Sequence, residues 1–122
     1  MSAPVWIGVA ALGSVAALAR FLVGGAIAVR TSSSLPLGTF AVNLSGSLLL
    51  GVASGAALTG DLRLLVGTAA IGSYTTFSTW QLETQRLREK GQTPAAAVNV
   101  LASIALGVAA VALGQAIGGW LQ

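Results

Sequence analysis

Hydroxyl and glycine residues are concentrated between Gly67 and Trp80, and this segment is the part of the chain best equipped for chemistry. Its fourteen positions hold six serine or threonine residues and two glycines. These residue types make poor helix interiors, because hydroxyl side chains compete for backbone groups and glycine adds chain entropy. We therefore predict a break in the helix near residues 72–76. Carbonyl oxygens freed at such a break are hard ligands that suit a small cation.

An aromatic pair adjoins the predicted break. Phe77 and Trp80 are three residues apart and therefore share a helix face, with Ser78 and Thr79 between them. The edge of an aromatic ring carries partial positive charge, so this pair is suited to line a path for an anion. Ordinary aromatic packing is the alternative interpretation.

Two further polar side chains lie within apolar stretches. Asn43 is an uncharged amide that is costly in a membrane unless it is paired, and its N–H groups can donate to an anion. Arg20 is the only charge well inside an apolar stretch. Two interpretations of Arg20 stay open: an anchor that reaches the membrane interface, or a partnered arginine beside an aqueous vestibule.

The composition decides which solvent these residues face. The 122 residues are 55% hydrophobic and only 7% charged, with a mean hydropathy of +0.86. So few charges cannot cover a water-facing surface, which excludes soluble, disordered and nucleic-acid-binding proteins. The chain has no cysteine or histidine, and none of its three carboxylates (Asp61, Glu83, Glu89) lies in the middle of an apolar stretch. These absences argue against an enzyme.

Four apolar stretches are long enough to cross a bilayer core about 30 Å thick, which takes roughly 20 residues. They cover residues 5–29, 36–58, 62–84 and 94–120, with short polar connections between them. The first stretch is too long for a signal peptide and no basic segment precedes it, so we expect a retained helix. The sequence therefore predicts an all-α membrane protein, a single domain over residues 1–122 with four transmembrane helices and a broken third helix.

The second and fourth stretches each carry polar and small residues at a spacing of four, on one helix face. These residues are Thr39, Asn43, Ser47, Gly51 and Gly55 in the second stretch, and Ala95, Asn99, Ser103 and Gly107 in the fourth. Small residues let membrane helices approach closely, so we interpret the glycines as helix contacts.

The basic residues are unevenly divided between the connections. Arg30, Arg86, Arg88 and Lys90 belong to the first and third connections, whereas only Arg63 belongs to the second. Because basic residues favour the cytoplasmic side, this bias predicts termini outside the cell.

Two segments together resemble the signature stretches of the Fluc (CrcB) fluoride channel family. They are the segment 38–47 (GTFAVNLSGS) and the segment 72–79 (GSYTTFST). Arg20 in the first stretch and the Asn99 face of the fourth match as well, and the resemblance covers nearly the whole chain.

The resemblance implies an antiparallel dual-topology dimer with two fluoride pores and a structural Na⁺ at its centre. Backbone carbonyls of Gly72 and Thr75 would hold the ion. The implied fluoride path comprises Asn43, Phe77, Ser78, Thr79, Trp80, Asn99 and Ser103, with Arg20 in the vestibule. Two positions depart from the family pattern: Trp80 stands where the family has a second pore phenylalanine, and Asn99 stands where it often has tyrosine.

The resemblance implies a channel that lets fluoride leave the cytoplasm by passive permeation, in the inner (plasma) membrane of a prokaryote. The expected partners are fluoride, the lipid bilayer and a second subunit, with no nucleic acid. That subunit is either an identical chain or a homologue of opposite charge bias. Two other functions stay open: a small four-helix proton-coupled multidrug exporter, which would need a carboxylate in the middle of a span, and a structural subunit of a membrane complex.

Overall fold

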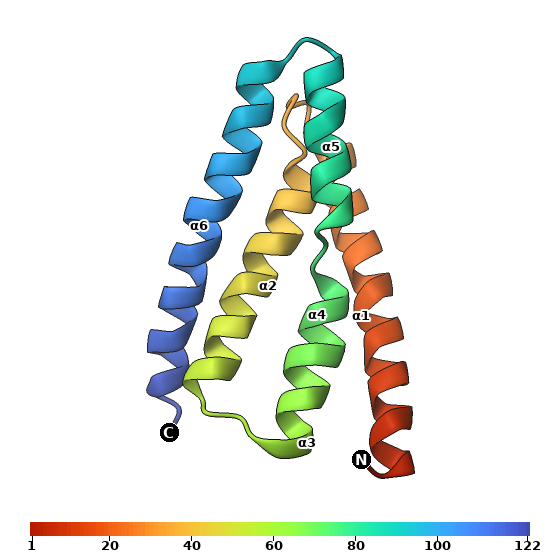
Figure 1. Ribbon diagram of the computed structural model, residues 1–122, viewed down its shortest axis with the longest axis vertical. Helices are drawn as coiled ribbons and strands as arrows, with labels where there is room; N and C mark the ends of the chain where they lie inside the picture. Colours follow the sequence, from red (N-terminus) through yellow and green to blue (C-terminus); the bar gives the residue numbers. More distant parts are fainter.

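The computed structural model describes all 122 residues and consists of helices and short connections (Figure 1). The elements are α1 (Ala3–Arg30), α2 (Leu37–Gly55), α3 (Gly60–Arg63), the π-helix η1 (Leu64–Ile71), α4 (Gly72–Tyr74), α5 (Ser78–Glu89) and α6 (Thr93–Gly119). Three of them, α1, α2 and α6, are long and apolar enough to cross a membrane. The elements α3, η1, α4 and α5 follow one another along a fourth path, which confirms the all-helical class with a broken third segment.

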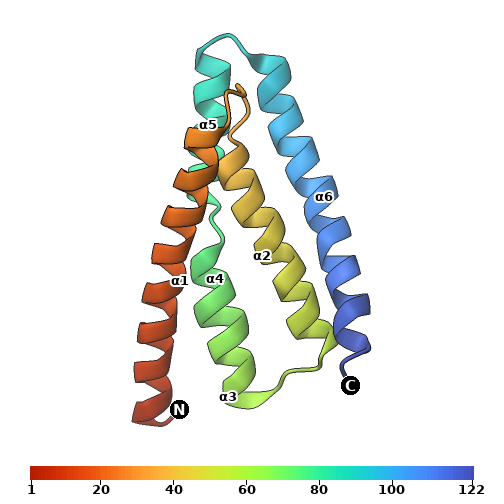
Figure 2. The ribbon, with the colours of Figure 1, turned by 180° about the vertical axis from the view of Figure 1, so that it is seen from behind.

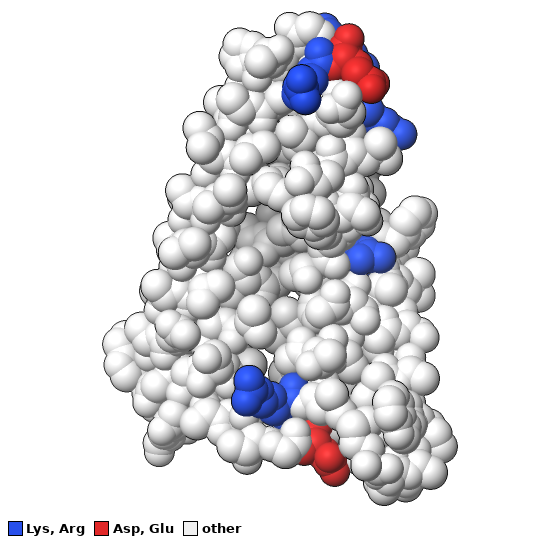
Figure 3. Space-filling view, viewed as in Figure 1, with Lys and Arg blue, Asp and Glu red and all other residues white.

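The elements form an open bundle with α1 and α6 at its outer edges (Figures 1 and 2). Both termini and the α2–α3 connection lie at one end, and the α1–α2 and α5–α6 connections lie at the other. Charged side chains gather at these two ends and leave the middle of the visible face almost free of charge (Figure 3). This distribution matches a bilayer with its apolar core across the middle of the bundle.

Glycines hold α2 tightly against α6. A Cβ atom built on Gly51 would overlap the Val111 carbonyl, and one on Gly114 would overlap the Leu48 carbonyl. The same close approach recurs one turn further along, at Gly55 and Gly118. The interpretation of Gly51 and Gly55 as contact residues is therefore confirmed. Gly114 and Gly118 are the glycines of α6 that approach α2 most closely, while a Cβ on Gly107 would lie 3.8 Å from Ser47 Oγ of α2.

The third segment is interrupted between α4 and α5. Thr75 has extended backbone angles (φ −80°, ψ 161°), and α5 begins at Ser78. The predicted break is confirmed, although it lies at the C-terminal side of the expected range because Gly72 keeps a helical conformation (φ −62°, ψ −36°). The residue types did not indicate the preceding π-helix. Such wide turns are rare and occur often at functional sites.

Few side chains are enclosed by the chain itself. Only 12 of the 122 residues are buried, and large apolar side chains are exposed along α1 and α6. A bundle this open needs lipid or another protein subunit against its sides, because water would not solvate them.

Candidate functional site

The amide of Asn43 bridges the interruption in the third segment. Its Oδ1 accepts a hydrogen bond from the Thr76 N–H, and its Nδ2 donates to the Thr76 carbonyl, each at 2.8 Å. Both polar groups of an unwound residue are thereby satisfied by one side chain on α2. An amide NH₂ carries two hydrogens, so one N–H of Asn43 is left over after this pairing.

A cavity of about 350 Å³ lies beside this bridge. Among the residues that line it are Asn43, Thr75, Thr76, Phe77, Trp80 and Ser103. We call it the central cavity. The interruption brings α2, α5 and α6 together here, so four residues predicted for the ion path (Asn43, Phe77, Trp80 and Ser103) share one space.

The aromatic pair lies on one side of the central cavity. The ring centroids of Phe77 and Trp80 are 5.7 Å apart and the rings are tilted by 58°. The indole Nε1–H of Trp80 donates to Ser103 Oγ at 3.1 Å, which links α5 to α6. Phe77 is 69% exposed, so much of its ring faces out of the chain.

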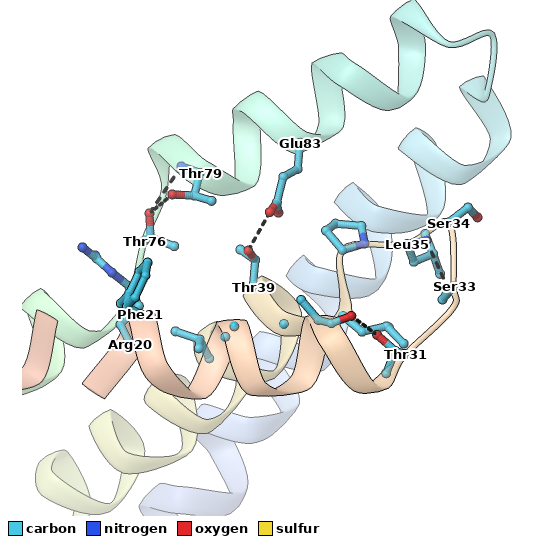
Figure 4. Close-up of a pocket in the computed structure, with 17 residues that line it drawn as sticks. Arg20, Phe21, Thr31, Ser33, Ser34, Leu35, Thr39, Thr76, Thr79 and Glu83 are labelled. Atoms are coloured by element: carbon cyan, nitrogen blue, oxygen red, sulfur yellow. Dashed lines mark hydrogen bonds between the residues drawn. The ribbon is translucent and has the colours of Figure 1, made fainter. Parts of the chain in front are cut away.

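A second cavity, of about 580 Å³, lies toward the α1–α2 connection (Figure 4). Arg20, Thr39, Thr79 and Glu83 are among its lining residues, and we call it the vestibule. Thr76 lines both cavities, so the interrupted backbone separates the vestibule from the central cavity. The two cavities therefore adjoin each other at the break.

Polar groups in the vestibule are only partly paired. Thr39 donates its hydroxyl to Glu83 Oε1 at 3.0 Å, as drawn in Figure 4, while Glu83 Oε2 is buried without a partner. The Arg20 guanidinium donates to the Thr75 carbonyl at 3.0 Å. Of the two interpretations of Arg20, this bond favours the arginine partnered inside the protein.

The carbonyls expected to bind sodium lie at the break. The Thr76 N–H donates to Asn43, so the Gly72 carbonyl lacks the donor four residues ahead that a continuous helix would supply. The Thr75 carbonyl accepts from Arg20 and keeps a second lone pair. Both are oxygen donors of the kind that a hard cation prefers, so the residues fit Na⁺. These two carbonyls alone are too few to surround an ion, so a bound Na⁺ would need further oxygens from a partner or water.

The other predicted residues lie outside the central cavity. Thr79 lines the vestibule, where its backbone N–H donates to the Thr76 hydroxyl. Ser78 is exposed and lines neither cavity. Asn99 is 4% exposed and donates to Thr84 Oγ1 at 2.9 Å, so it joins α6 to α5. A direct role for Ser78 and Asn99 in the ion path stays a prediction.

Sequence reasoning did not single out Thr76 or Thr84. Thr76 stands inside the predicted break, so the break indicated that its backbone groups would need partners outside the helix. Thr84 follows Trp80 by four residues and donates to the Trp80 carbonyl at 2.8 Å. Nothing in the sequence marked it as the partner of Asn99.

Comparison with known proteins decides the family. Residues 7–115 match the family model described as CrcB-like protein, Camphor Resistance (CrcB). The chain belongs to the CrcB-like family. A relative in Mycolicibacterium paratuberculosis, named fluoride-specific ion channel FluC 2, is 55% identical over 111 residues, which is 91% of each chain.

More distant relatives carry the same kind of name. A fluoride-specific ion channel FluC 2 of Mycobacterium tuberculosis is 47% identical over 115 residues, covering 94% of this chain and 91% of the relative. A protein of that name in Haloarcula marismortui is 43% identical over 109 residues, or 89% of each chain. The family expected from the two signature segments is thus confirmed over most of the chain.

Proposed function

We propose that this CrcB-like chain is a fluoride channel that lets fluoride leave the cytoplasm by passive permeation. The observation that carries the proposal is the central cavity, where an amide, a hydroxyl and two aromatic rings converge on a broken helix. The names of the relatives support the same ion. The chain acts as a channel and not as an enzyme.

The chemistry of the cavity suits a small anion. Moving a carboxylate-sized ion into a low dielectric costs on the order of 20 kcal/mol by Born estimates, and the smaller fluoride ion costs more. Donors in the protein must therefore replace its water. The remaining Asn43 N–H, the Ser103 hydroxyl and the positive edges of Phe77 and Trp80 are of this kind.

Arg20 gives the path a direction of entry. The bond to the Thr75 carbonyl holds the Arg20 guanidinium at the break, where it attracts anions, while the Glu83 carboxylate of the same vestibule is bonded to Thr39. Fluoride would pass from the vestibule, by Thr76, into the central cavity. Thr79 lines the vestibule part of this route. The exposed Ser78 would act at the contact with the second subunit, and Asn99 would act by packing α6 against α5.

The functional unit in this proposal is an antiparallel dual-topology dimer with two pores. A single chain leaves Phe77 largely exposed and its apolar sides open, so it cannot enclose a path on its own. A second copy, or a homologous subunit of opposite charge bias, would close the open side. The charge bias between the two ends is compatible with both compositions, and the prokaryotic inner membrane is the proposed location.

Sodium has a structural role in this unit. The Gly72 and Thr75 carbonyls of both subunits would hold a Na⁺ at the dimer centre, where its charge stabilises the interrupted backbone. Main-chain oxygens supply the site, so the side chains of these residues contribute little to it.

Fluoride efflux tests the proposal. The chain is purified alone, reconstituted into liposomes loaded with potassium fluoride, and the fluoride released after valinomycin addition is followed with an electrode. We expect rapid release that needs no proton gradient and is far slower for chloride. A proton-coupled exporter or a structural subunit gives no such release, so its absence from a chain that elutes as a homodimer contradicts the proposal.

A further inference from the structure

The hydrogen bond from Trp80 to Ser103 has no counterpart with a phenylalanine. A phenyl ring has no polar hydrogen, whereas the indole donates its Nε1–H to Ser103 Oγ at 3.1 Å. Both residues line the central cavity and come from different helices. The residue that departs from the family pattern therefore acts on a hydroxyl inside the proposed fluoride path.

The hydroxyl of Ser103 differs from those of Ser14, Ser45 and Thr84, which bond within their own helices. Ser14, Ser45 and Thr84 each donate to the carbonyl four residues earlier in their own helix, at 2.7–2.8 Å. Ser103 makes no such bond and only accepts, from Trp80. A hydroxyl has one hydrogen to donate, so that of Ser103 is not used by its own helix.

The donor of this bond is itself held in place. The Trp80 ring packs against Phe77 with centroids 5.7 Å apart, and the side chain is half-buried. The Trp80 carbonyl accepts from Thr84, which in turn accepts from the buried Asn99 of α6. Trp80 is thus fixed at its ring and at its backbone, so its N–H approaches Ser103 from one direction.

We propose that Trp80 is a positioning residue that holds the Ser103 hydroxyl with its hydrogen directed into the central cavity, as a donor to fluoride. The inference rests on the proposed function and adds a specificity device to it. When an oxygen accepts a hydrogen bond, its own O–H becomes more polarised and donates more strongly. The pair therefore offers the anion a fixed, strengthened donor in place of a freely rotating hydroxyl.

Without the indole N–H, Ser103 is free to bond within its own helix, as Ser14, Ser45 and Thr84 do. It then rotates toward the Asn99 carbonyl, four residues earlier, and its hydrogen is lost to the path. The contribution of Ser103 to permeation should therefore depend on Trp80. Side chains in contact can also be coupled through packing, so the conservative variant Ser103→Thr and a spectroscopic measurement accompany the flux cycle.

A double-mutant cycle measures this coupling. Fluoride efflux from liposomes is compared for the wild type, Trp80→Phe, Ser103→Ala and the double variant, with Ser14→Ala as a matched control outside both cavities. We expect Ser103→Ala to slow efflux about tenfold when Trp80 is present, as loss of one hydrogen bond to a charge does, and about twofold or less in the Trp80→Phe background. The conservative variant Ser103→Thr should keep the wild-type rate within about twofold. Equal slowing in both backgrounds overturns the inference.

A spectroscopic titration tests the pair without any flux. The chain has three tryptophans, and Trp6 and Trp120 are 60% and 83% exposed, so replacing both with Phe leaves Trp80 as the only indole. Added potassium fluoride should shift the ¹⁵N–¹H indole resonance of Trp80, and potassium chloride at equal ionic strength should not. Ser103→Ala should reduce the shift, leaving only the direct effect of fluoride on the Trp80 ring, and Ser103→Thr should retain it in full.

The two measurements separate the inference from the proposed function. If the wild-type chain elutes as a homodimer and releases no fluoride, the proposed function fails, while the titration still decides whether the pair senses the anion. If the wild type conducts but the Trp80 resonance ignores fluoride, or shifts equally in Ser103→Ala, the role of Trp80 is overturned and the channel stands.

Discussion

Removing the Asn43 amide should destabilise the protein more than the burial of the Asn43 side chain alone predicts. Asn43→Ala deletes both 2.8 Å bonds to Thr76 and leaves one backbone N–H and one carbonyl without partners. Each unpaired group costs about 1–3 kcal/mol in a protein interior, and hydrogen bonds in membrane proteins average nearer the lower figure. The expected loss of unfolding free energy is therefore about 2–4 kcal/mol.

Asn99→Ala is the matched control for this prediction. Asn99 is the more deeply buried amide, at 4% exposure, but its side chain makes a single hydrogen bond, to the Thr84 hydroxyl. If backbone pairing sets the cost, Asn99→Ala loses only about 1–2 kcal/mol. Denaturant unfolding in detergent, followed by circular dichroism, compares the two variants. A greater loss in Asn99→Ala than in Asn43→Ala would refute the reasoning, because burial would then outweigh the bridge.

Four further changes have expected outcomes. Phe77→Ile removes a positive ring edge from the central cavity and should slow fluoride efflux at least about tenfold without loss of dimer on size-exclusion chromatography; unchanged efflux removes Phe77 from the path. Gly72→Leu should weaken the dimer if the partner subunit covers the central cavity, because Gly72 lines that cavity and an added Cβ would meet little within its own chain (3.8 Å to the Gly67 carbonyl); an intact dimer counts against an axis at the break. Gly114→Leu should disrupt the packing of α2 against α6, which the same chromatography detects as loss of the dimer peak. Gly25→Ala should leave that peak unchanged, because nothing lies within 4 Å of an added Cβ. A reporter on the C-terminus should give signal from both sides of the membrane if the chain pairs with itself, and from the outside alone if it needs an oppositely oriented subunit.

The helices could be predicted because a bilayer imposes length and hydropathy on them. The expected stretches differ from the observed helices by at most a few residues at either end, apart from α5, which continues to Glu89 as a charged extension. The break was predictable from local residue types. Its exact position was not, because the pairing of Thr76 with Asn43 decides where the helix stops, and that contact joins residues 33 positions apart.

The candidate site was predictable where it depends on local residue types, and not where it depends on contacts between distant residues. Residue types and the resemblance pointed to Asn43, Phe77, Trp80 and Ser103, which meet in one cavity. The contact of Asn99 with Thr84, and of Arg20 with the Thr75 carbonyl, depends on how α5 and α1 pack against their neighbours. Spacing along one helix carries no information about such contacts. The sequence could therefore place Asn99 on a helix face, but it could not identify Thr84 as its hydrogen-bond partner.

Blocking the central cavity with a thiol reagent tests the central claim most directly. The chain has no native cysteine, so Ser47→Cys places a single thiol in the lining of this cavity, and Ser14→Cys places one on α1 outside both cavities. Each variant is treated with a methanethiosulfonate, its labelled fraction is measured by mass spectrometry, and its fluoride efflux from liposomes is recorded. If fluoride passes through the central cavity, efflux by the Ser47→Cys variant falls in proportion to the labelled fraction, and labelled Ser14→Cys conducts normally. Undiminished efflux by fully labelled Ser47→Cys would contradict the account.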